Sequence, residues 1–337
     1  MEEAEMNKSS LLCKLHPEKI HTEVLPWLYL CLALLGFLTN GLVLLDLWKA
    51  EKKPMVIFTV NMVVSDIILC CSFLFRFAYL RLYLEWKSGS PICTLSQYGI
   101  IGIFYINIYC NMCFLLWTSL NRYATVVQPH NVLLQVFKQP RFCHLICITT
   151  WLIFTLAVFG NVFYSQMNTK AIQGSCFDQV YNKKTTYKSS HILGIIIFFL
   201  NLALMSTSYG LLVYHLQRIH RTSLVRAWLG PGGGLRVRRK IMASVVLFIT
   251  CFLPYHIQRT IIIQSDPGDC VKQQRNSYTH SITVLVAALN SCLNPTLYLI
   301  IRSTFCRKKR PVTHVTADNS RCNQDPGKHD ITAPETI

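Results

Sequence analysis

The hydrophobic positions of this 337-residue chain are gathered into seven long runs, separated by polar and mostly basic stretches. A helix needs about 20 mainly apolar residues to cross a lipid bilayer. Windows of this kind lie at residues 25–48, 55–79, 96–121, 143–165, 190–214, 241–263 and 279–301. Backbone polar groups have no water partner inside a membrane, so each run is predicted to be a helix. Asn107 and Asn111 interrupt the third run and are expected to face other helices.

The composition favours a membrane protein over a soluble one. Hydrophobic residues make up 52% of the chain and charged residues 15%, whereas roughly a quarter of a typical soluble domain is charged. The same values exclude an intrinsically disordered chain. We therefore predict an all-α membrane protein with a seven-transmembrane helix bundle at residues 25–301. Residues 1–24 form the expected extracellular N-terminus, and residues 302–337 a short amphipathic helix followed by a disordered cytoplasmic tail.

The orientation in the membrane is predicted from the distribution of Lys and Arg. Three connections (49–54, 122–142 and 215–240) and the proximal tail (302–310) hold 18 of these residues, against 11 on the opposite side. Cytoplasmic loops carry the excess of Lys and Arg, so the chain is expected to be a multi-pass plasma-membrane protein with its N-terminus outside the cell. The net charge of +17 is attributed to this bias and to anionic membrane lipids, rather than to nucleic acid.

Two charged residues of the spans are candidates for function. Asp66 lies in the middle of the second span, where an ionisable group is costly and is therefore a functional hypothesis by default. Arg122, in the sequence Asn121-Arg122-Tyr123, closes the third span on the predicted cytoplasmic side. Taken alone, Arg122 is equally consistent with a side chain that extends along the helix to reach water.

Landmark residues fall one per span, in the order found in the class A (rhodopsin-like) G-protein-coupled receptors. They are Asn40, Asp66, Arg122, Trp151, Tyr209, Pro254 and the Asn294-Pro295-x-x-Tyr298 motif, with Phe305 beyond it. One match is weak, but seven in order are very specific, and the chain resembles this family over about residues 24–306. The resemblance implies a receptor rather than an enzyme. It also implies an outer ligand site and an inner cleft for a heterotrimeric G protein.

The sixth span indicates a branch within that family. Its sequence Pro254-Tyr255-His256-Ile257-Gln258-Arg259-Thr260 looks like the purinergic nucleotide and cysteinyl leukotriene receptors. Phe252 stands where most class A members have Trp, which suits the same branch. The stretches 117–125 and 137–142 are also similar to one orphan receptor of this class.

The candidate ligand site consists of cationic and aromatic residues in the outer halves of the spans. They are Arg76, Tyr105, Tyr109, Lys188, His256 and Arg259. Arginine binds carboxylate and phosphate through its planar fork of donors, so we expect an extracellular anionic small molecule, nucleotide-like or a lipid acid. The alternatives are that Arg259 extends to the membrane surface and that the tyrosines are packing aromatics or interface anchors.

The resemblance assigns G-protein coupling and switching to residues near the inner side. They are Asn121, Arg122, Tyr123, Tyr209, Phe252, Pro254, Asn294, Pro295 and Tyr298. A ligand would shift the population towards a state in which the sixth helix swings out about Pro254. Most members have an acidic residue in place of Asn121, so Arg122 is expected to lack its usual restraint and the basal activity to be raised.

No cofactor is required, but a sodium site is implied. Asp66, Asn111, Asn290, Ser291 and Asn294 match positions that line an allosteric sodium ion in many class A receptors. A carboxylate with neutral oxygens suits a hard cation. The alternative is a cluster of hydrogen-bonded water without an ion.

Covalent features are also implied by the resemblance. Cysteines outside the bilayer face an oxidising compartment, where Cys93 would pair with Cys176 and, as in the nucleotide-receptor branch, Cys13 with Cys270. Asn7 begins a glycosylation sequon, and Cys306 is a candidate for palmitoylation.

Three alternatives remain at this level: a constitutively active receptor, a ligand-scavenging receptor, and a transporter-like membrane protein. A transporter would be expected to show internal repeats and paired broken helices, and neither is evident. The histidines lack metal-ligand spacing and no Gly-rich phosphate loop precedes a helix. A retinal-binding photoreceptor is excluded because residues 279–301 contain no lysine.

Overall fold

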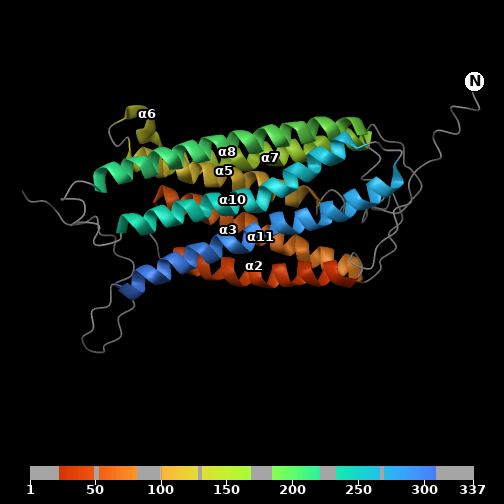
Figure 1. Cartoon of the computed structure of the whole chain (residues 1–337), viewed down its shortest axis with the longest axis horizontal. Coiled ribbons are helices and arrows are strands. Elements are labelled where there is room, and N and C mark those ends of the chain that lie inside the picture. Colours follow the sequence, from red (N-terminus) through yellow and green to blue (C-terminus); the bar gives the residue numbers. More distant parts are fainter. Residues whose placement is uncertain are drawn as a thin grey trace, which may run out of the picture.

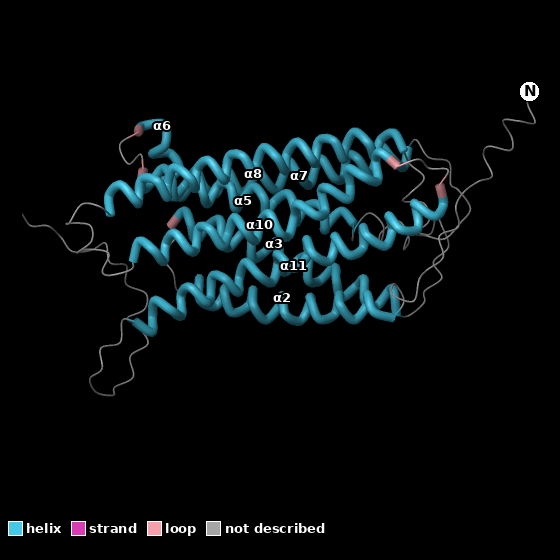
Figure 2. The backbone as a smooth tube through the Cα atoms, viewed as in Figure 1, coloured by secondary structure: helices cyan, strands magenta, loops and turns pink. Residues whose placement is uncertain are grey.

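The computed structural model shows a bundle of long helices that lie lengthwise beside one another (Figure 1). It describes residues 23–48, 53–81, 99, 101–127, 131–167, 184–220, 233–265 and 269–308. The helices are α2 (Leu25–Trp48), α3 (Pro54–Arg81), α5 (Ile101–Val126), α6 (Val132–Gln135), the 3₁₀ helix η3 (Val136–Lys138), α7 (Pro140–Met167), α8 (Lys184–His220), α10 (Gly233–Gln264) and α11 (Cys270–Lys308). No strand occurs in this part of the chain (Figure 2).

Seven of these helices are long and apolar enough to cross a membrane, as predicted. All seven overlap the predicted runs, and α8, α10 and α11 extend beyond theirs by several residues. α5 continues to Val126 instead of ending at Asn121, so Arg122 lies inside a helix with one further turn beyond it. Pro254 and Pro295 also lie inside their helices, α10 and α11, rather than at the ends.

The seventh span and the residues that follow it form one helix. α11 runs without interruption to Lys308, so the described residues do not separate a short amphipathic helix from the span. The expected extracellular segment before residue 23 and the tail from residue 309 lie outside the described residues.

α5 lies at the centre of the bundle. In its most apolar 18-residue window 72% of residues are buried, compared with 22% for α7. Asn107 and Asn111 of α5 are both buried, which confirms that they face other helices. A central helix has no lipid-facing side, so it accommodates polar residues that a peripheral helix would expose to lipid.

The peripheral helices expose a continuous apolar surface. Large aliphatic side chains at helical spacing point outward from α2, α7 and α8: Leu34, Leu38, Leu42, Leu45, Leu145, Ile148, Leu152, Leu156, Leu193, Ile196 and Leu200. In water an apolar surface of this extent would be unfavourable, whereas lipid chains cover it without a penalty. The surface therefore agrees with a membrane-embedded bundle.

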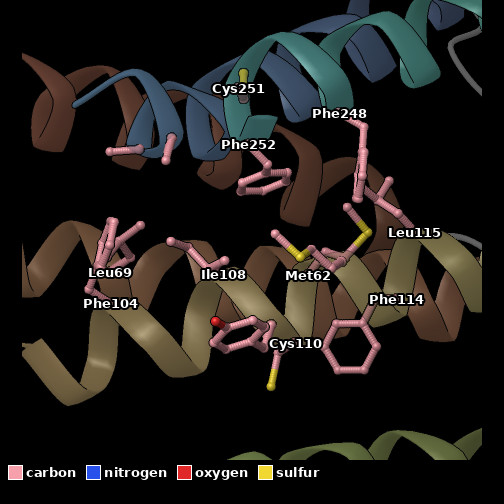
Figure 3. Close-up of a cluster of buried hydrophobic side chains, with 14 of the residues drawn as sticks. Met62, Leu69, Phe104, Ile108, Cys110, Phe114, Leu115, Phe248, Cys251 and Phe252 are labelled. Atoms are coloured by element: carbon pink, nitrogen blue, oxygen red, sulfur yellow. The ribbon is translucent and has the colours of Figure 1, made fainter. Parts of the chain in front are cut away.

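The interior is packed by aromatic and sulfur-containing side chains from several helices. Figure 3 shows Phe252 extending from α10 towards α5, where Ile108 and Phe114 lie. Phe252 is 1% exposed, and its ring centroid lies 5.3 Å from that of Phe248 in an edge-to-face arrangement. Phe248 and Phe252 thus pack on each other along α10, and Phe252 extends towards the central helix.

Polar landmark residues join helices that are distant in sequence. The amide of Asn40 on α2 donates to the backbone oxygen of Ser291 on α11, with a nitrogen–oxygen distance of 2.9 Å. The indole nitrogen of Trp151 on α7 donates to the side-chain oxygen of Asn61 on α3 over 3.1 Å. Side-chain hydrogen bonds of this kind stabilise membrane helix pairs where water cannot compete.

Gly36 allows α2 and α3 to approach closely. A methyl group at this position would overlap the sulfur of Cys70, which is itself buried. At Gly41, just over one turn further along α2, an added methyl group would meet no atom within 4 Å. Small residues at such crossings bring helix backbones together in membranes.

We expect Gly36→Ala to destabilise the bundle by about 1–3 kcal/mol, the usual cost of overpacking. Gly41→Ala is the matched control and should be neutral or slightly stabilising, because alanine favours the helix and meets no neighbour. The measurement is thermal unfolding of purified protein in lipid nanodiscs. Adding Cys70→Ala should restore the stability of Gly36→Ala, and equal unfolding midpoints for the two glycine variants would contradict the close approach.

Candidate functional site

Arg259 is the centre of a buried cluster contributed by three helices. The side chain, 3% exposed, extends from α10 and donates through Nε to Nδ1 of His191 on α8. Its Nη1 atom donates to the hydroxyl oxygen of Tyr109 on α5 over 2.9 Å. The guanidinium group is thereby fixed in position by hydrogen bonds to two side chains.

Aromatic rings cover the faces of the same guanidinium group. Its central carbon lies 5.0 Å from the ring centroid of Tyr105 and 5.3 Å from that of Tyr255. These distances are in the range of cation–π interactions. Phe104 in turn packs edge-to-face on Tyr255, with centroids 5.8 Å apart. The charge of Arg259 is thus held in an aromatic environment and does not reach the membrane surface.

The backbone of α8 approaches this cluster through Gly194. A methyl group on Gly194 would overlap the hydroxyl group of Tyr109. The lack of a side chain therefore lets Tyr109 reach Arg259 while its ring stacks on Phe154 of α7, with centroids 5.6 Å apart. One glycine on α8 thus controls the position of a tyrosine on α5.

His256 lies one turn before Arg259 on α10 and is 1% exposed. Its ring stacks on Phe198 of α8, with centroids 4.3 Å apart. Neither ring nitrogen has a hydrogen-bond partner among the described residues. A buried imidazole without a partner is costly, which marks it as a group able to bind a ligand.

The structure brings together four of the six residues predicted to bind ligand: Tyr105, Tyr109, His256 and Arg259. Arg76 lies apart from them, over the ring of Tyr29 on α2, at 4.9 Å from its centroid. The side chain of Lys188 lies outside the described residues.

Arg122 lies near the opposite end of α5, about 20 Å from Tyr109 at the helical rise of about 1.5 Å per residue. Its Nη1 atom is 3.5 Å from the hydroxyl oxygen of Tyr209 on α8, and its Nε donates to the sulfur of Met55 on α3 over 3.4 Å. Its guanidinium carbon lies 6.0 Å from the Tyr209 ring. Among the described residues no carboxylate contacts Arg122.

Asn121 contacts the connection between α5 and α7 and not Arg122. Its amide donates to the backbone oxygen of Phe137, in η3, over 2.6 Å. The thiol of Cys143 on α7 donates to the same oxygen over 3.4 Å. The ring of Phe137 stacks on Trp117 of α5, 6.2 Å between centroids, and meets Phe142 of α7 at 5.7 Å. We call this arrangement the Phe137 clasp.

The other predicted switch residues lie within helices. The hydroxyl of Tyr298 on α11 donates to Oδ2 of Asp46 on α2 over 3.1 Å, so Tyr298 is bonded away from Arg122 and Tyr209. The Asn294 amide donates to Oδ1 of Asn290 over 3.0 Å. Pro254 and Pro295 remain inside α10 and α11, and Tyr123 is half-buried beside Arg122.

Asp66 is buried at the middle of the bundle, between the two ends. Its Oδ1 atom accepts from the amide of Asn111 over 2.6 Å and from the amide of Asn107 over 3.1 Å. The Asn107 amide also donates to the hydroxyl oxygen of Ser65 over 3.0 Å. These bonds provide the charge-assisted partners that a buried carboxylate requires.

The remaining predicted sodium ligands contact α2 and one another. Ser291 donates to the backbone oxygen of Ala288 over 2.8 Å and receives the Asn40 bond on its own carbonyl. No hydrogen bond joins Asn290, Ser291 or Asn294 to Asp66 within the described part of the chain. The side-chain oxygen of Asn111 is buried without a partner there, so Asp66 and Asn111 together offer a carboxylate and a neutral oxygen. This donor set suits a hard cation.

The predicted covalent features fall on residues that the structure does not describe. Asn7, Cys13, Cys93 and Cys176 lie outside the described residues, as do the side chains of Cys270 and Cys306. They stay predictions.

Comparison with known proteins identifies the family. Residues 39–298 match the family described as 7 transmembrane receptor (rhodopsin family). This chain belongs to that family. It is therefore a receptor and not an enzyme, and its seven spans fit a multi-pass protein of the plasma membrane.

Several relatives of the receptor fall in the branch that the sixth span indicated. A purinoceptor of Rattus norvegicus is 27% identical over 252 residues, which cover 70% of this chain and 65% of the relative. Cysteinyl leukotriene receptor 1 of Cavia porcellus is 27% identical over 309 residues, covering 86% and 84%. Probable G-protein coupled receptor 82 of Mus musculus is 26% identical over 316 residues, covering 86% and 94%. The last is the orphan receptor that stretches 117–125 and 137–142 resemble.

Sequence reasoning missed several residues that complete the clusters of this receptor. Asn107 was predicted to face other helices, but its bond to Asp66 was not predicted. Asp46 also had a signal, because an acidic residue in the first span indicates a partner on another helix. His191 and the carbonyl group of Phe137 had none, since their partners come from helices or connections far away in sequence.

For the receptor, loss of the Asn121 donor should loosen the Phe137 clasp. A carboxylate cannot donate to a carbonyl oxygen and repels it, so we expect Asn121→Asp to speed amide hydrogen exchange in residues 131–139 at least as much as Asn121→Ala. The measurement is exchange followed by mass spectrometry. Thr118→Ala is the control, because the Thr118 hydroxyl donates within α5. Unchanged exchange in both Asn121 variants would contradict the clasp.

Proposed function

We propose that this receptor binds an extracellular anionic small molecule, nucleotide-like or a lipid acid, and in response activates a heterotrimeric G protein. The observation that carries this proposal is the buried Arg259, fixed by His191 and Tyr109 among aromatic rings. The orientation rests on the excess of Lys and Arg at the opposite end, which puts the Arg259 end outside the cell.

The chemistry around Arg259 favours an anion over a cation. α5, α8 and α10 contain no Asp or Glu, so these helices give the cluster a positive charge. A buried guanidinium presents N–H donors in a planar fork that matches carboxylate and phosphate. His256 and the tyrosines add polar atoms on apolar rings, which suits an anion carried on a nucleoside or a lipid body. Two of the relatives are named for purines and cysteinyl leukotrienes.

The proposed mechanism is a shift between two states of α10. Arg259 and His256 lie on the outer part of α10, and Pro254 lies in the same helix just inward of them. An anion that binds Arg259 more tightly in one position of α10 shifts the population to that position by its differential affinity. At the opposite end, a displaced α10 would leave Arg122 and Tyr209 facing a cleft that admits the G protein.

We expect Arg259→Gln to lower the potency of an anionic agonist by about 10- to 100-fold, because hydrogen bonds to charged groups contribute about 1.5–3 kcal/mol. The assay is G-protein activation in cells that express the receptor, screened with nucleotides, lipid acids and dicarboxylates. Arg275→Gln is the control, an exposed arginine at the same end. Arg259→Lys should be intermediate, since it keeps the charge without the fork. Unaltered potency in Arg259→Gln would remove this site.

A second candidate function is constitutive signalling, which the environment of Arg122 favours. Arg122 contacts a thioether, a hydroxyl group and a ring, and Asn121 is engaged in the Phe137 clasp. An acidic restraint on Arg122 is thus missing from the described residues. We propose that the receptor samples its active state without ligand more than most members of the family.

We expect ligand-free G-protein activation above that of empty membranes, and Arg122→Ala should lower it severalfold. Nucleotide exchange on the G protein in isolated membranes measures this directly, with receptor numbers matched by a surface tag. Arg141→Ala is the control, an exposed arginine at the same end. Equal activity in empty membranes and in membranes holding the receptor would exclude the constitutive function.

We propose that sodium binds at Asp66, with Asn111 contributing its side-chain oxygen. The ion would favour the resting state by adding positive charge beside the carboxylate. This proposal is supported by the buried carboxylate and by the unpartnered amide oxygen of Asn111 in the described structure.

Replacing sodium with N-methyl-D-glucamine at constant ionic strength should lower the unfolding midpoint of the purified receptor. In Asp66→Asn the midpoint should be the same in both salts, whereas Asp46→Asn should retain the difference. A midpoint of the unmodified receptor that ignores the exchange of cation would favour a water cluster at this position.

A further inference from the structure

A second group of polar side chains lies at the same end of the bundle as Arg259, on different helices. Tyr29 lies near the start of α2, Arg76 near the end of α3, and His280 in the early turns of α11. These helix ends lead to the end of the bundle where Arg259 is found on α10. Neither Tyr29 nor His280 entered the ligand site predicted from the sequence.

Arg76 contacts the ring of Tyr29. Its guanidinium carbon lies 4.9 Å from the centroid of that ring. Among the described residues no acceptor takes a hydrogen bond from the Arg76 guanidinium. Arg81, further along α3, lies over the ring of Trp27 at 5.4 Å but is exposed to the surroundings. Arg76 is half-buried, so water solvates its charge less well than it solvates the charge of Arg81.

Two further polar atoms at this end of the bundle are buried without partners in the described structure. Tyr29 is 0% exposed, and its hydroxyl oxygen makes no hydrogen bond in the described structure. Nδ1 of His280 is buried and likewise without a partner there. Buried polar groups are normally hydrogen-bonded, and each exception requires an explanation. Here a hydroxyl and an imidazole, both able to donate to an anion, have unpartnered atoms at the end of the bundle where Arg76 lies.

His280 and Tyr255 are the described residues that relate Arg76 to Arg259. Both Arg76 and Arg259 act electrostatically on His280. The ring of Tyr255 lies 5.9 Å from that of His280 and 5.3 Å from the Arg259 guanidinium. Phe104 packs on the same tyrosine. An aromatic, largely apolar surface therefore separates the two cationic groups.

We propose that Tyr29, Arg76 and His280 form a second anion-binding subsite, and that the ligand of this receptor carries two anionic groups joined by an apolar segment. Arg259 binds one carboxylate or phosphate, and Arg76 binds the other bidentately while Tyr29 and His280 donate to its remaining oxygens. The apolar segment lies against Tyr255 and Phe104. This inference rests on the proposed function, since it presumes that Arg259 binds an anion.

The unpartnered atoms also lead to a prediction for the stability of the receptor without ligand. A side chain retained for binding stabilises the empty receptor little or not at all. Purified Tyr29→Phe and Arg76→Gln should therefore unfold at the temperature of the unmodified receptor or above it, in nanodiscs of neutral phosphatidylcholine. A clear loss of stability in Arg76→Gln would show that the cation–π contact with Tyr29 is structural, and would overturn the subsite.

The decisive experiment compares probes with one and two anionic groups. The probes are α,ω-dicarboxylic acids of increasing chain length and the monocarboxylic acids of equal length. Affinities come from the shift of the unfolding midpoint with probe concentration. Neutral nanodiscs keep anionic lipid headgroups from competing, and a parallel series with phosphatidylglycerol tests them. At least one diacid should bind about ten times more tightly than its monoacid, and phosphatidylglycerol should weaken it no more than the monoacid.

The variants separate this inference from the function it rests on. Arg76→Gln and Tyr29→Phe should reduce the advantage of the diacid to less than threefold and leave the monoacid unchanged, whereas Arg81→Gln should retain the advantage. Arg259→Gln should weaken both probes. If Arg259→Gln weakens both but no diacid exceeds its monoacid, the subsite is wrong and the proposed function stands. If Arg259→Gln changes neither, the proposed function fails. If phosphatidylglycerol alone abolishes the diacid advantage, the subsite binds lipid headgroups and the two-anion ligand is wrong.

Discussion

A polar group inside a membrane must find its partner within the protein, and this constraint determines how the bundle is assembled. The amide of Asn40 reaches the backbone of α11, Trp151 reaches Asn61, and two asparagines of α5 share the carboxylate of Asp66. Each bond fixes one helix against another. Hydrophobic packing alone discriminates poorly between arrangements of apolar helices in lipid, so these few bonds select the arrangement.

α5 and α10 both extend between the two candidate sites at the ends of the bundle. α5 contributes Tyr109 to one cluster and Arg122 to the other, and its middle holds the asparagines around Asp66. α10 carries Arg259 beyond Pro254, and its Tyr255 packs on Phe104 of α5. A displacement of α10 at the Arg259 cluster would therefore disturb the contact between Tyr255 and Phe104. Residues of one helix, α5, therefore lie in the Arg259 cluster, around Asp66 and beside Tyr209.

The spans were predictable from the sequence because a run of about 20 apolar residues has few other stable states. Within the site, Arg259 and His256 were predictable because they share a face of one helix, which spacing alone fixes. The contact between Arg259 and His191 was not predictable, because it depends on how α8 is rotated against α10. The close approach of α8 to Tyr109 and Arg259 also depends on the missing side chain of Gly194. The end of α5 was misplaced since its last turn, with Arg122, is polar although helical. Asn121 was interpreted through the charge it lacks, whereas its contact depends on the fold of the α6–η3 connection.

The Phe137 clasp has a consequence for how the receptor tolerates sequence change. Its acceptor is a main-chain oxygen, which every amino acid supplies, so no substitution at position 137 deletes that atom. Its donor belongs to a single side chain, Asn121. The hydrogen bond therefore tolerates any residue at position 137 and depends on the residue at position 121, whereas the ring contacts with Trp117 and Phe142 require an aromatic side chain at position 137.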